Sequence, residues 1–256
     1  WKFIGDRLHA GPAGGELLLD GKPPDAGEIM RLPELGETLR AIAEGGAEAF
    51  YHGDIGARIA EFVQSRGGWL TRDDFKAHTS EWVEPISTTY RGYTCWQCPP
   101  PSQGVNTLMA LNLAEGFDLG EMGSQSLDTY HHLIESVRLA FADGLHHVTD
   151  PDHMAASVSS LLSKDYAESR RAEIRADRAI PEVGPGLVTS HPNTVYVSCV
   201  DGQGNACSFI NSVFMGFGTG LVVPGTGIAL HCRGMSFSLD PDHVNALAPN
   251  KRPFHT

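Results

Sequence analysis

Apolar residues recur with a helical period through much of the chain. Residues 35–50, 54–64, 105–114 and 127–148 each repeat apolar side chains three and four positions apart, as amphipathic helices do. In the longest segment, 127–148, the apolar positions form one stripe: Tyr130, Leu133, Ile134, Val137, Phe141 and Leu145. The spacing predicts that the longest helix is buried through this stripe.

Shorter signals lie between and after these helices. Residues 71–74 have the spacing of a capping box, which begins a helix. Residues 86–97 mix β-branched and aromatic side chains about an Arg91-Gly92 turn, which predicts a β-hairpin. Residues 159–175 are rich in charge and predict one exposed helix.

The period of the pattern changes near residue 180. The proline- and glycine-rich run 180–186 cannot hold regular structure. Residues 194–200 and 205–213 then read as two strands with a period of two, joined by a turn at 201–204. Helices followed by strands predict an α+β fold in which helices cover an antiparallel sheet.

Composition narrows the classes of function. Among 256 residues, Lys and Arg number 19 against 31 for Asp and Glu, and the net charge of −12 argues against nucleic acid as a partner. No apolar run approaches the about 18 residues of a membrane span, and 5 cysteines are too few for a disulfide scaffold. The start at Trp1 suggests a piece of a longer precursor. It lacks a signal-peptide pattern, which favours the cytoplasm over the periplasm or secretion.

The most specific candidate chemistry begins at Thr194, the first residue of the first late strand. A threonine there becomes a nucleophile if the preceding peptide bond is cut, because the new α-amino group can act as the general base. The alternative from position alone is an ordinary β-branched strand residue. Glycine-rich turns at 216–220 and 225–227 follow the strands and would let the backbone approach such a site.

Several ordered motifs accompany this strand. They are 50–53 (FYHG), 67–75 (GGWLTRDDF), 90–93 (YRGY), 99–102 (PPPS), 140–143 (AFAD), 150–152 (DPD) and 250–253 (NKRP). With these motifs and the segment from Thr194, most of the chain resembles the gamma-glutamyltranspeptidase family of N-terminal nucleophile (Ntn) hydrolases.

The resemblance implies a fold, a maturation step and a reaction. The fold is the Ntn-hydrolase αββα four-layer sandwich. Self-cleavage between Asn193 and Thr194 divides the chain into a mainly helical part, 1–193, and a β-rich part, 194–256, which stay associated as two subunits. Thr194 then attacks a small-molecule amide and forms an acyl-enzyme. The resemblance implies neither a metal nor an organic cofactor.

Three residues expected near the nucleophile bear on this interpretation: Ser212, Val195 and Tyr196. Ser212 stands where the family has a second threonine whose hydroxyl hydrogen-bonds the nucleophile, and serine preserves that donor. It could equally be a polar residue of a half-exposed strand. Val195 and Tyr196 replace the Thr and His that follow the nucleophile in typical members, a departure that leaves the nucleophile in place.

The substrate-binding positions depart further from the family. Phe214, Arg233 and Ser236 stand where typical members hold the α-amino group of a γ-glutamyl substrate with an Asn, a Gln or Glu and an Asp. His255 and Thr256 replace the paired serines after the Lys-Arg-Pro motif. A guanidinium would oppose an ammonium but could bind a carboxylate, which predicts altered acyl specificity, for example toward oxamate. Arg233 could instead be a surface ion-pair residue.

Two alternatives remain from the sequence. The family's oxyanion-hole glycines are expected after Thr256 and its α-carboxylate-binding arginine before Trp1, so this piece alone could be a catalytically silent, structural chain. The second alternative is a thiol or zinc protein that uses Cys95 and Cys98, which have a two-residue spacing without a second ligand pair.

Overall fold

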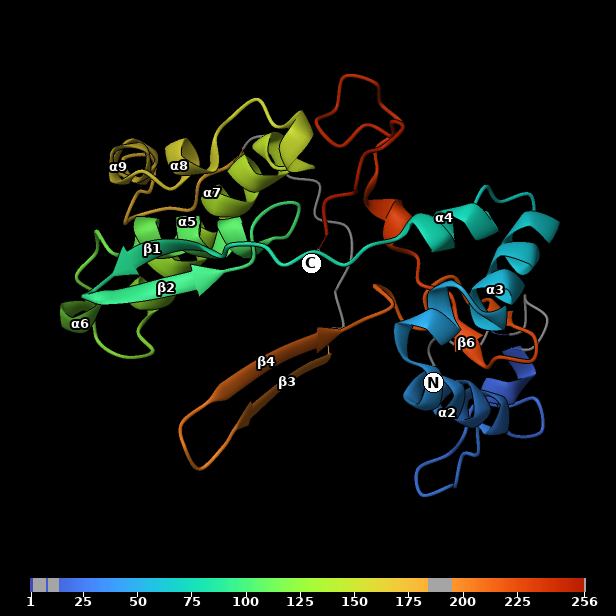
Figure 1. Ribbon diagram of the computed structural model, residues 1–256. Helices are drawn as coiled ribbons and strands as arrows, with labels where there is room; N and C mark the ends of the chain where they lie inside the picture. Colours follow the sequence, from blue (N-terminus) through green and yellow to red (C-terminus); the bar gives the residue numbers. More distant parts are fainter. Residues whose placement is uncertain (2–7, 9–13, 184–194, 256) are drawn as a thin grey trace. The chain divides into compact units, whose positions relative to one another are not determined.

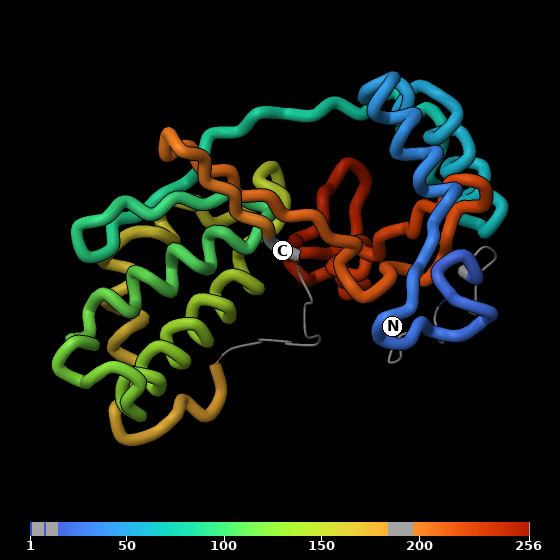
Figure 2. The backbone as a smooth tube through the Cα atoms, turned by 90° about the horizontal axis from the view of Figure 1, so that it is seen from below, coloured from blue at the N-terminus to red at the C-terminus, as the bar shows by residue number. Residues whose placement is uncertain are grey.

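The computed structural model describes residues 1, 8, 14–183 and 195–255 (Figures 1 and 2). Two compact units form. Trp1–Glu81 and His191–Arg233 make the first unit, and Trp82–Ser190 and Gly234–Thr256 make the second. Each unit therefore joins an early segment of the chain to a late one. Helices and strands are mixed, which confirms the α+β class in its coarse form.

Among its described residues, the first unit has the α-helices α2 (Pro33–Tyr51), α3 (Asp54–Ser65) and α4 (Arg72–Ala77). The capping box that begins α4 is confirmed, because the Thr71 hydroxyl accepts the Asp74 N–H and the Asp74 carboxylate accepts the Thr71 N–H. Ile55 and Ile59 of α3 pack on Val223. A short 3-10 helix η1 (Gly14–Leu17) precedes these helices.

Two small antiparallel hairpins complete the first unit. One consists of β3 (Val195–Val200) and β4 (Ala206–Asn211), and the other of β5 (Val222–Val223) and β6 (Ile228–Ala229). The register of β3 and β4 runs from Val195 opposite Asn211 to Val200 opposite Ala206. The two late strands are thus confirmed. All six residues of β4 are exposed.

The second unit is built on two long helices with a hairpin beside them. The helices are α5 (Gly104–Ala114) and α7 (Leu127–His147), and the hairpin joins β1 (Ile86–Tyr90) to β2 (Tyr93–Gln97), as expected (Figures 1 and 2). The core between α5 and α7 is apolar and includes Val105, Met109, Leu139 and Ala140.

Shorter helices of the second unit are α6 (Leu119–Met122), η2 (Pro151–His153), α8 (Val158–Leu161) and α9 (Lys164–Arg171). A last 3-10 turn, η3 (Arg233–Ser236), begins at the final residue of the first unit. The prediction of one helix over 159–175 is wrong. Ser163 accepts the N–H of Tyr166 and begins α9 anew, which divides the segment into two helices.

The predicted buried face of α7 is only partly correct: Leu133, Phe141 and Leu145 are half-buried, and Leu145 packs against the core. Tyr130, Ile134 and Val137 of the apolar stripe are 51%, 55% and 45% exposed. The buried face is instead made largely of small and polar residues: His132, Glu135, Ser136, Leu139, Ala140, Ala142, Asp143 and Gly144. A Cβ on Gly144 would lie 2.0 Å from the Asn106 side chain, so the small residues of α7 allow α5 to approach closely.

None of the helices in residues 14–183 and 195–255 is long and apolar enough to cross a lipid bilayer.

Candidate functional site

The proposed nucleophile and its cleavage site, Thr194 and Asn193, lie outside the described residues, as does Thr256. The geometry of the site is therefore built from the other predicted residues. Ser212 directly follows the last residue of β4, just as Thr194 directly precedes the first residue of β3 in the sequence. Ser212 thus lies at the open end of the β3–β4 hairpin.

Ser212 and Phe214 lie in a tight turn after β4. The Ser212 hydroxyl oxygen accepts the backbone N–H of Phe214 at 2.9 Å. A hydroxyl that accepts one hydrogen bond still holds a proton that it can donate. Phe214 has φ 78°, a left-handed conformation uncommon for a side chain of this size.

Arg233 joins this turn. Its guanidinium lies over the Phe214 ring, 5.4 Å from the ring centroid, and donates to the carbonyl of Ser212 at 3.5 Å. Cation–π contact of this kind holds a guanidinium against an aromatic ring. The structure therefore brings together three of the predicted site residues, and the cation is one of them.

His231 adds to the electrostatics of this cluster. Partial burial, and then the positive charge of Arg233, lower the pKa of His231. The backbone N–H of Arg233 donates to Nδ1 of His231 at 3.3 Å, which requires that nitrogen to be unprotonated. At neutral pH the positive charge is therefore carried by Arg233.

A glycine-rich turn holds the cluster against the chain that leads to Arg233. Thr219 donates its N–H to the carbonyl of Leu230 at 2.8 Å, and Cys232 donates its N–H to the carbonyl of Val213 at 3.2 Å. Gly218 has φ 58°, and a Cβ there would lie 2.1 Å from the Leu230 oxygen. Glycine at this position therefore lets the turn pack closely on the Leu230 carbonyl, whereas the expected approach to Thr194 stays a prediction.

The remaining predicted substrate residues lie in the second unit. His255 forms an isolated parallel β-bridge with Ser102. The backbone N–H of His255 donates to the Pro101 carbonyl, and the His255 carbonyl accepts the Gln103 N–H, each at 3.0 Å. Ser236 ends the 3-10 turn η3, which Arg233 begins.

Asp150 anchors the segment that carries His255. The side chain of Asp150 is 3% exposed and accepts the backbone N–H of Arg252 at 2.8 Å and its Nε at 2.9 Å. The hydrogen bonds from the Arg252 guanidinium lower the pKa of Asp150 to about 2. Sequence reasoning assigned neither residue a role, although both belong to motifs that were recognised, the Asp-Pro-Asp and Lys-Arg-Pro runs.

Asn245 provides a second anchor for the same segment. Its buried side chain accepts the Thr149 hydroxyl at 2.9 Å and the Phe254 N–H at 3.2 Å, and it donates to the Val148 carbonyl at 3.1 Å. Together with Asp150, it fixes residues 252–255 to the end of α7.

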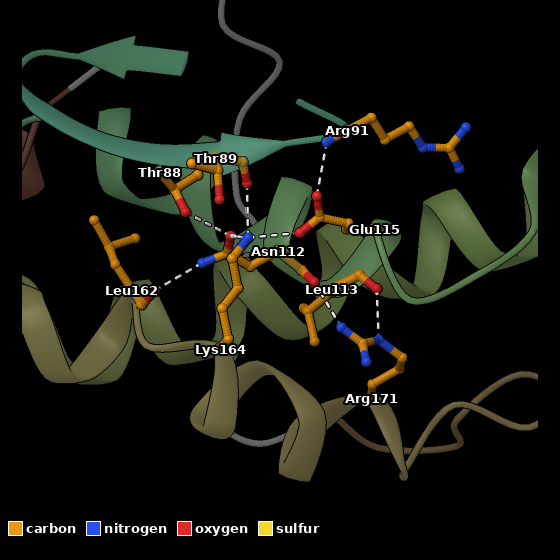
Figure 3. Close-up of polar contacts among 9 residues, drawn as sticks. All are labelled: Thr88, Thr89, Arg91, Asn112, Leu113, Glu115, Leu162, Lys164 and Arg171. Carbon is orange, nitrogen blue, oxygen red and sulfur yellow. Dashed lines mark hydrogen bonds and ion pairs between the residues drawn. The ribbon is translucent and has the colours of Figure 1, made fainter. Parts of the chain in front are cut away.

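A second polar cluster surrounds Lys164 in the second unit (Figure 3). Lys164 of α9 donates to the Thr89 carbonyl, to Asn112 Oδ1 and to Glu115 Oε2 at 2.6 to 2.7 Å. The hydrogen bond from Lys164 lowers the pKa of Glu115. All three protons of the ammonium have acceptors, and Arg171 donates to two carbonyls of α5. The cluster braces α5, α9 and β1, and the Lys164 ammonium has no proton left for a ligand.

The thiol or zinc alternative would need several metal-ligating side chains grouped at one place. Within the part of the chain that the structure describes, no three His, Cys, Asp or Glu side chains are grouped so that they could hold a metal ion. Cys95 lies opposite Thr88 in the first hairpin, and Cys98 follows the end of β2.

Comparison with known proteins identifies relatives over nearly the whole chain. The profile of the family described as gamma-glutamyltranspeptidase matches residues 5–256. The glutathione hydrolase-like YwrD proenzyme of Bacillus subtilis (strain 168) is 42% identical over 236 residues, which are 92% of this chain and 44% of that protein. The oxamate amidohydrolase proenzyme of Klebsiella pneumoniae subsp. pneumoniae is 36% identical over 242 residues, 93% of this chain and 44% of that protein.

Solved structures give the same result. The cephalosporin acylase from Bacillus halodurans is 45% identical and superposes with a TM-score of 0.88, covering 100% of this chain and 47% of that one. The gamma-glutamyltranspeptidase of Helicobacter pylori is 27% identical, with a TM-score of 0.66 over 74% of this chain and 56% of that one. The chain thus spans about half the length of the relatives it matches.

Proposed function

Because the chain belongs to the gamma-glutamyltranspeptidase family, we propose that the whole protein is an amide-cleaving hydrolase or acyltransferase that matures from a precursor. Maturation is a break between Asn193 and Thr194, which leaves parts 1–193 and 194–256 associated. The proenzymes among the relatives support this step. A catalytically silent chain would show neither the break nor an acyl-enzyme.

In the maturation step, the Thr194 hydroxyl oxygen attacks the carbonyl carbon of Asn193. The peptide C–N bond breaks, the nitrogen takes up a proton, and an ester joins the two parts. Water then hydrolyses the ester, which leaves a carboxylate on Asn193 and a free α-amino group on Thr194. Catalysis reuses the same atoms, because that amino group removes the hydroxyl proton as the oxygen attacks a substrate amide. The proton passes to the leaving amine, and water or another amine accepts the acyl group.

Ser212 is proposed to hydrogen-bond the nucleophile. If the register of β3 and β4 continues by one residue beyond Val195 and Asn211, position 212 falls opposite position 194. The hydroxyl of Ser212 accepts the Phe214 N–H, so its own proton is available for the threonine oxygen. The four-layer αββα sandwich is proposed for the whole protein on its likeness to the solved relatives.

Specificity is proposed to favour acyl groups that carry a carboxylate and lack an α-ammonium. The observation that carries this proposal is the Arg233 guanidinium held over Phe214 beside Ser212. Burying an ammonium next to this cation would be unfavourable, whereas a carboxylate would form a charge-assisted hydrogen bond. Oxamate has a carboxylate adjacent to its amide, and the Klebsiella relative is named for it. The substrate-binding roles of Ser236, His255 and Thr256 stay predictions from the family resemblance.

The test compares substrates in the full-length protein. kcat/KM should be higher for glutaryl anilide and for oxamate than for γ-glutamyl anilide, and Arg233→Gln should lower the first two values at least tenfold. Arg66→Gln is the matched control, because Arg66 lies over Phe62 at 5.5 Å and loses the same type of contact away from the site. A wide preference for γ-glutamyl anilide in the wild type would overturn the specificity proposal and leave an ordinary transpeptidase.

A further inference from the structure

Two cysteines face one another across the hairpin of β3 and β4. Cys199 is the register partner of Cys207, and both are free, exposed thiols. Directly opposite residues of an antiparallel pair project from the same face of the sheet, with Cα atoms about 4.5 to 5.5 Å apart. Disulfides need Cα atoms about 4.4 to 6.8 Å apart. The backbone therefore satisfies the distance requirement without moving.

The turn next to this pair holds the two strands in register. Asp201 Oδ1 accepts the N–H groups of Gln203 and Asn205 at 2.9 Å, and Oδ2 accepts the Asn205 side chain at 2.8 Å. The Asp201 N–H donates to the Asn205 carbonyl at 3.0 Å. Each cysteine is two residues from this network, so the fold itself keeps the thiols at short range.

The other three cysteines have different surroundings. Cys95 lies opposite Thr88, Cys98 follows the end of β2, and Cys232 is buried with its thiol directed at the Val213 carbonyl, 3.7 Å away. All three lie outside the β3–β4 ladder, and they therefore serve as internal controls.

We infer that Cys199 and Cys207 form a cross-strand disulfide when the protein meets a small-molecule disulfide. The thiolate of one cysteine attacks the reagent, forms a mixed disulfide and releases one thiolate. The thiolate of the second cysteine attacks the protein sulfur of the mixed disulfide and releases the other. The two protons lost by the cysteines are taken up by the two released thiolates, and the two electrons leave with them.

The disulfide would close a short covalent loop around the turn. It ties β3, the strand that follows residue 194, to β4, the strand that precedes Ser212. A closed loop stabilises the hairpin chiefly by restricting the unfolded chain. This inference rests on the register of the strands and does not depend on the proposed function.

The test uses the full-length protein treated with hydroxyethyl disulfide, a reagent without an amide bond. Free thiols are then alkylated, and the protein is digested without reduction and analysed by mass spectrometry. The expected product carries Cys199 and Cys207 joined by a disulfide, within one peptide or, after cleavage at Asp201, as a linked pair, and is lighter than the dithiol form by two hydrogen atoms. Alkylation of both cysteines, stable mixed disulfides at both, or linkage to a different cysteine would each overturn the inference.

Two single variants keep the test independent of folding differences. In Cys199→Ser, Cys207 should stop at the mixed disulfide, and in Cys95→Ser the linked pair should still form. Thermal unfolding gives a second readout, because the Tm of the oxidised wild type should exceed that of the reduced protein by a few degrees. The double variant Cys199→Ser, Cys207→Ser should show no such difference. An equal difference in the double variant would contradict the assignment.

Discussion

Replacing Asp150 by Asn should destabilise the protein above pH 4 and leave it nearly unchanged near pH 2. The side chain is almost fully buried and accepts three hydrogen bonds from Arg252 at 2.8 to 3.1 Å. Asparagine keeps the shape but removes the charge and turns one acceptor into a donor that faces a guanidinium. The anchor of residues 252–255 is thereby weakened.

The magnitude follows from the pKa of Asp150. Hydrogen bonds from Arg252 lower the pKa of Asp150 from 3.8 to about 2. Because one pKa unit corresponds to about 1.4 kcal/mol, the ionised carboxylate stabilises the folded protein by at most about 2.5 kcal/mol. Arg252 is 56% exposed, so solvent screens part of the interaction, and we expect about 1 to 2 kcal/mol. Because the folded pKa is the lower one, this stabilisation is complete above about pH 4 and is lost as the pH falls through about 2.

Urea unfolding of the full-length protein across pH 2 to 7 measures this difference. Asp152→Asn is the control, since it removes the same charge two residues away from an exposed side chain. The free energy of unfolding should fall for Asp150→Asn and stay within about 0.5 kcal/mol of wild type for Asp152→Asn. Equal losses in the two variants, or a loss for Asp150→Asn that persists at pH 2, would refute the reasoning.

Three further predictions concern other parts of the molecule. Prolonged chelation should leave activity unchanged, since a threonine alkoxide needs a base and oxyanion donors; a loss that zinc restores would favour the thiol and metal alternative. Gly218→Ala should lower the unfolding free energy by at least about 2 kcal/mol, because it combines a positive φ with overlap at the Leu230 oxygen, whereas Gly234→Ala has open space and should have little effect. Ultraviolet titration should show one tyrosine, Tyr166, that ionises near pH 12, because burial and then the Asp143 charge raise its pKa to about 12; its ionisation near pH 10 would contradict this.

Local chemistry explains which elements the sequence could predict. The capping box at Thr71 and the hairpin about Arg91 and Gly92 depend on neighbouring residues, so their signals are complete within a few positions. The buried face of α7 depends on α5. Small residues such as Gly144 let α5 approach α7 closely, and the apolar stripe of α7 does not predict this contact between the two helices.

The same distinction applies to the site. Ser212, Phe214 and Arg233 were recognised from a family pattern, and the structure places them in contact, although no hydropathy period would have united them. Asp150 and Arg252 are separated by 102 positions, and their pairing depends on how the second unit closes. The sequence shows the Asp-Pro-Asp and Lys-Arg-Pro motifs separately, but it does not show that Asp150 pairs with Arg252.

The central claim is that Thr194 becomes the N-terminus of a processed subunit and acts as the nucleophile. Intact mass measurement and N-terminal sequencing of the full-length protein test it most directly, with Thr194→Ala as the paired variant. The account predicts two fragments in the wild type, one of which begins Thr-Val-Tyr-Val, and one uncut, inactive chain in the variant. An active wild type without a new N-terminal threonine, or a variant that is cut normally, would contradict it.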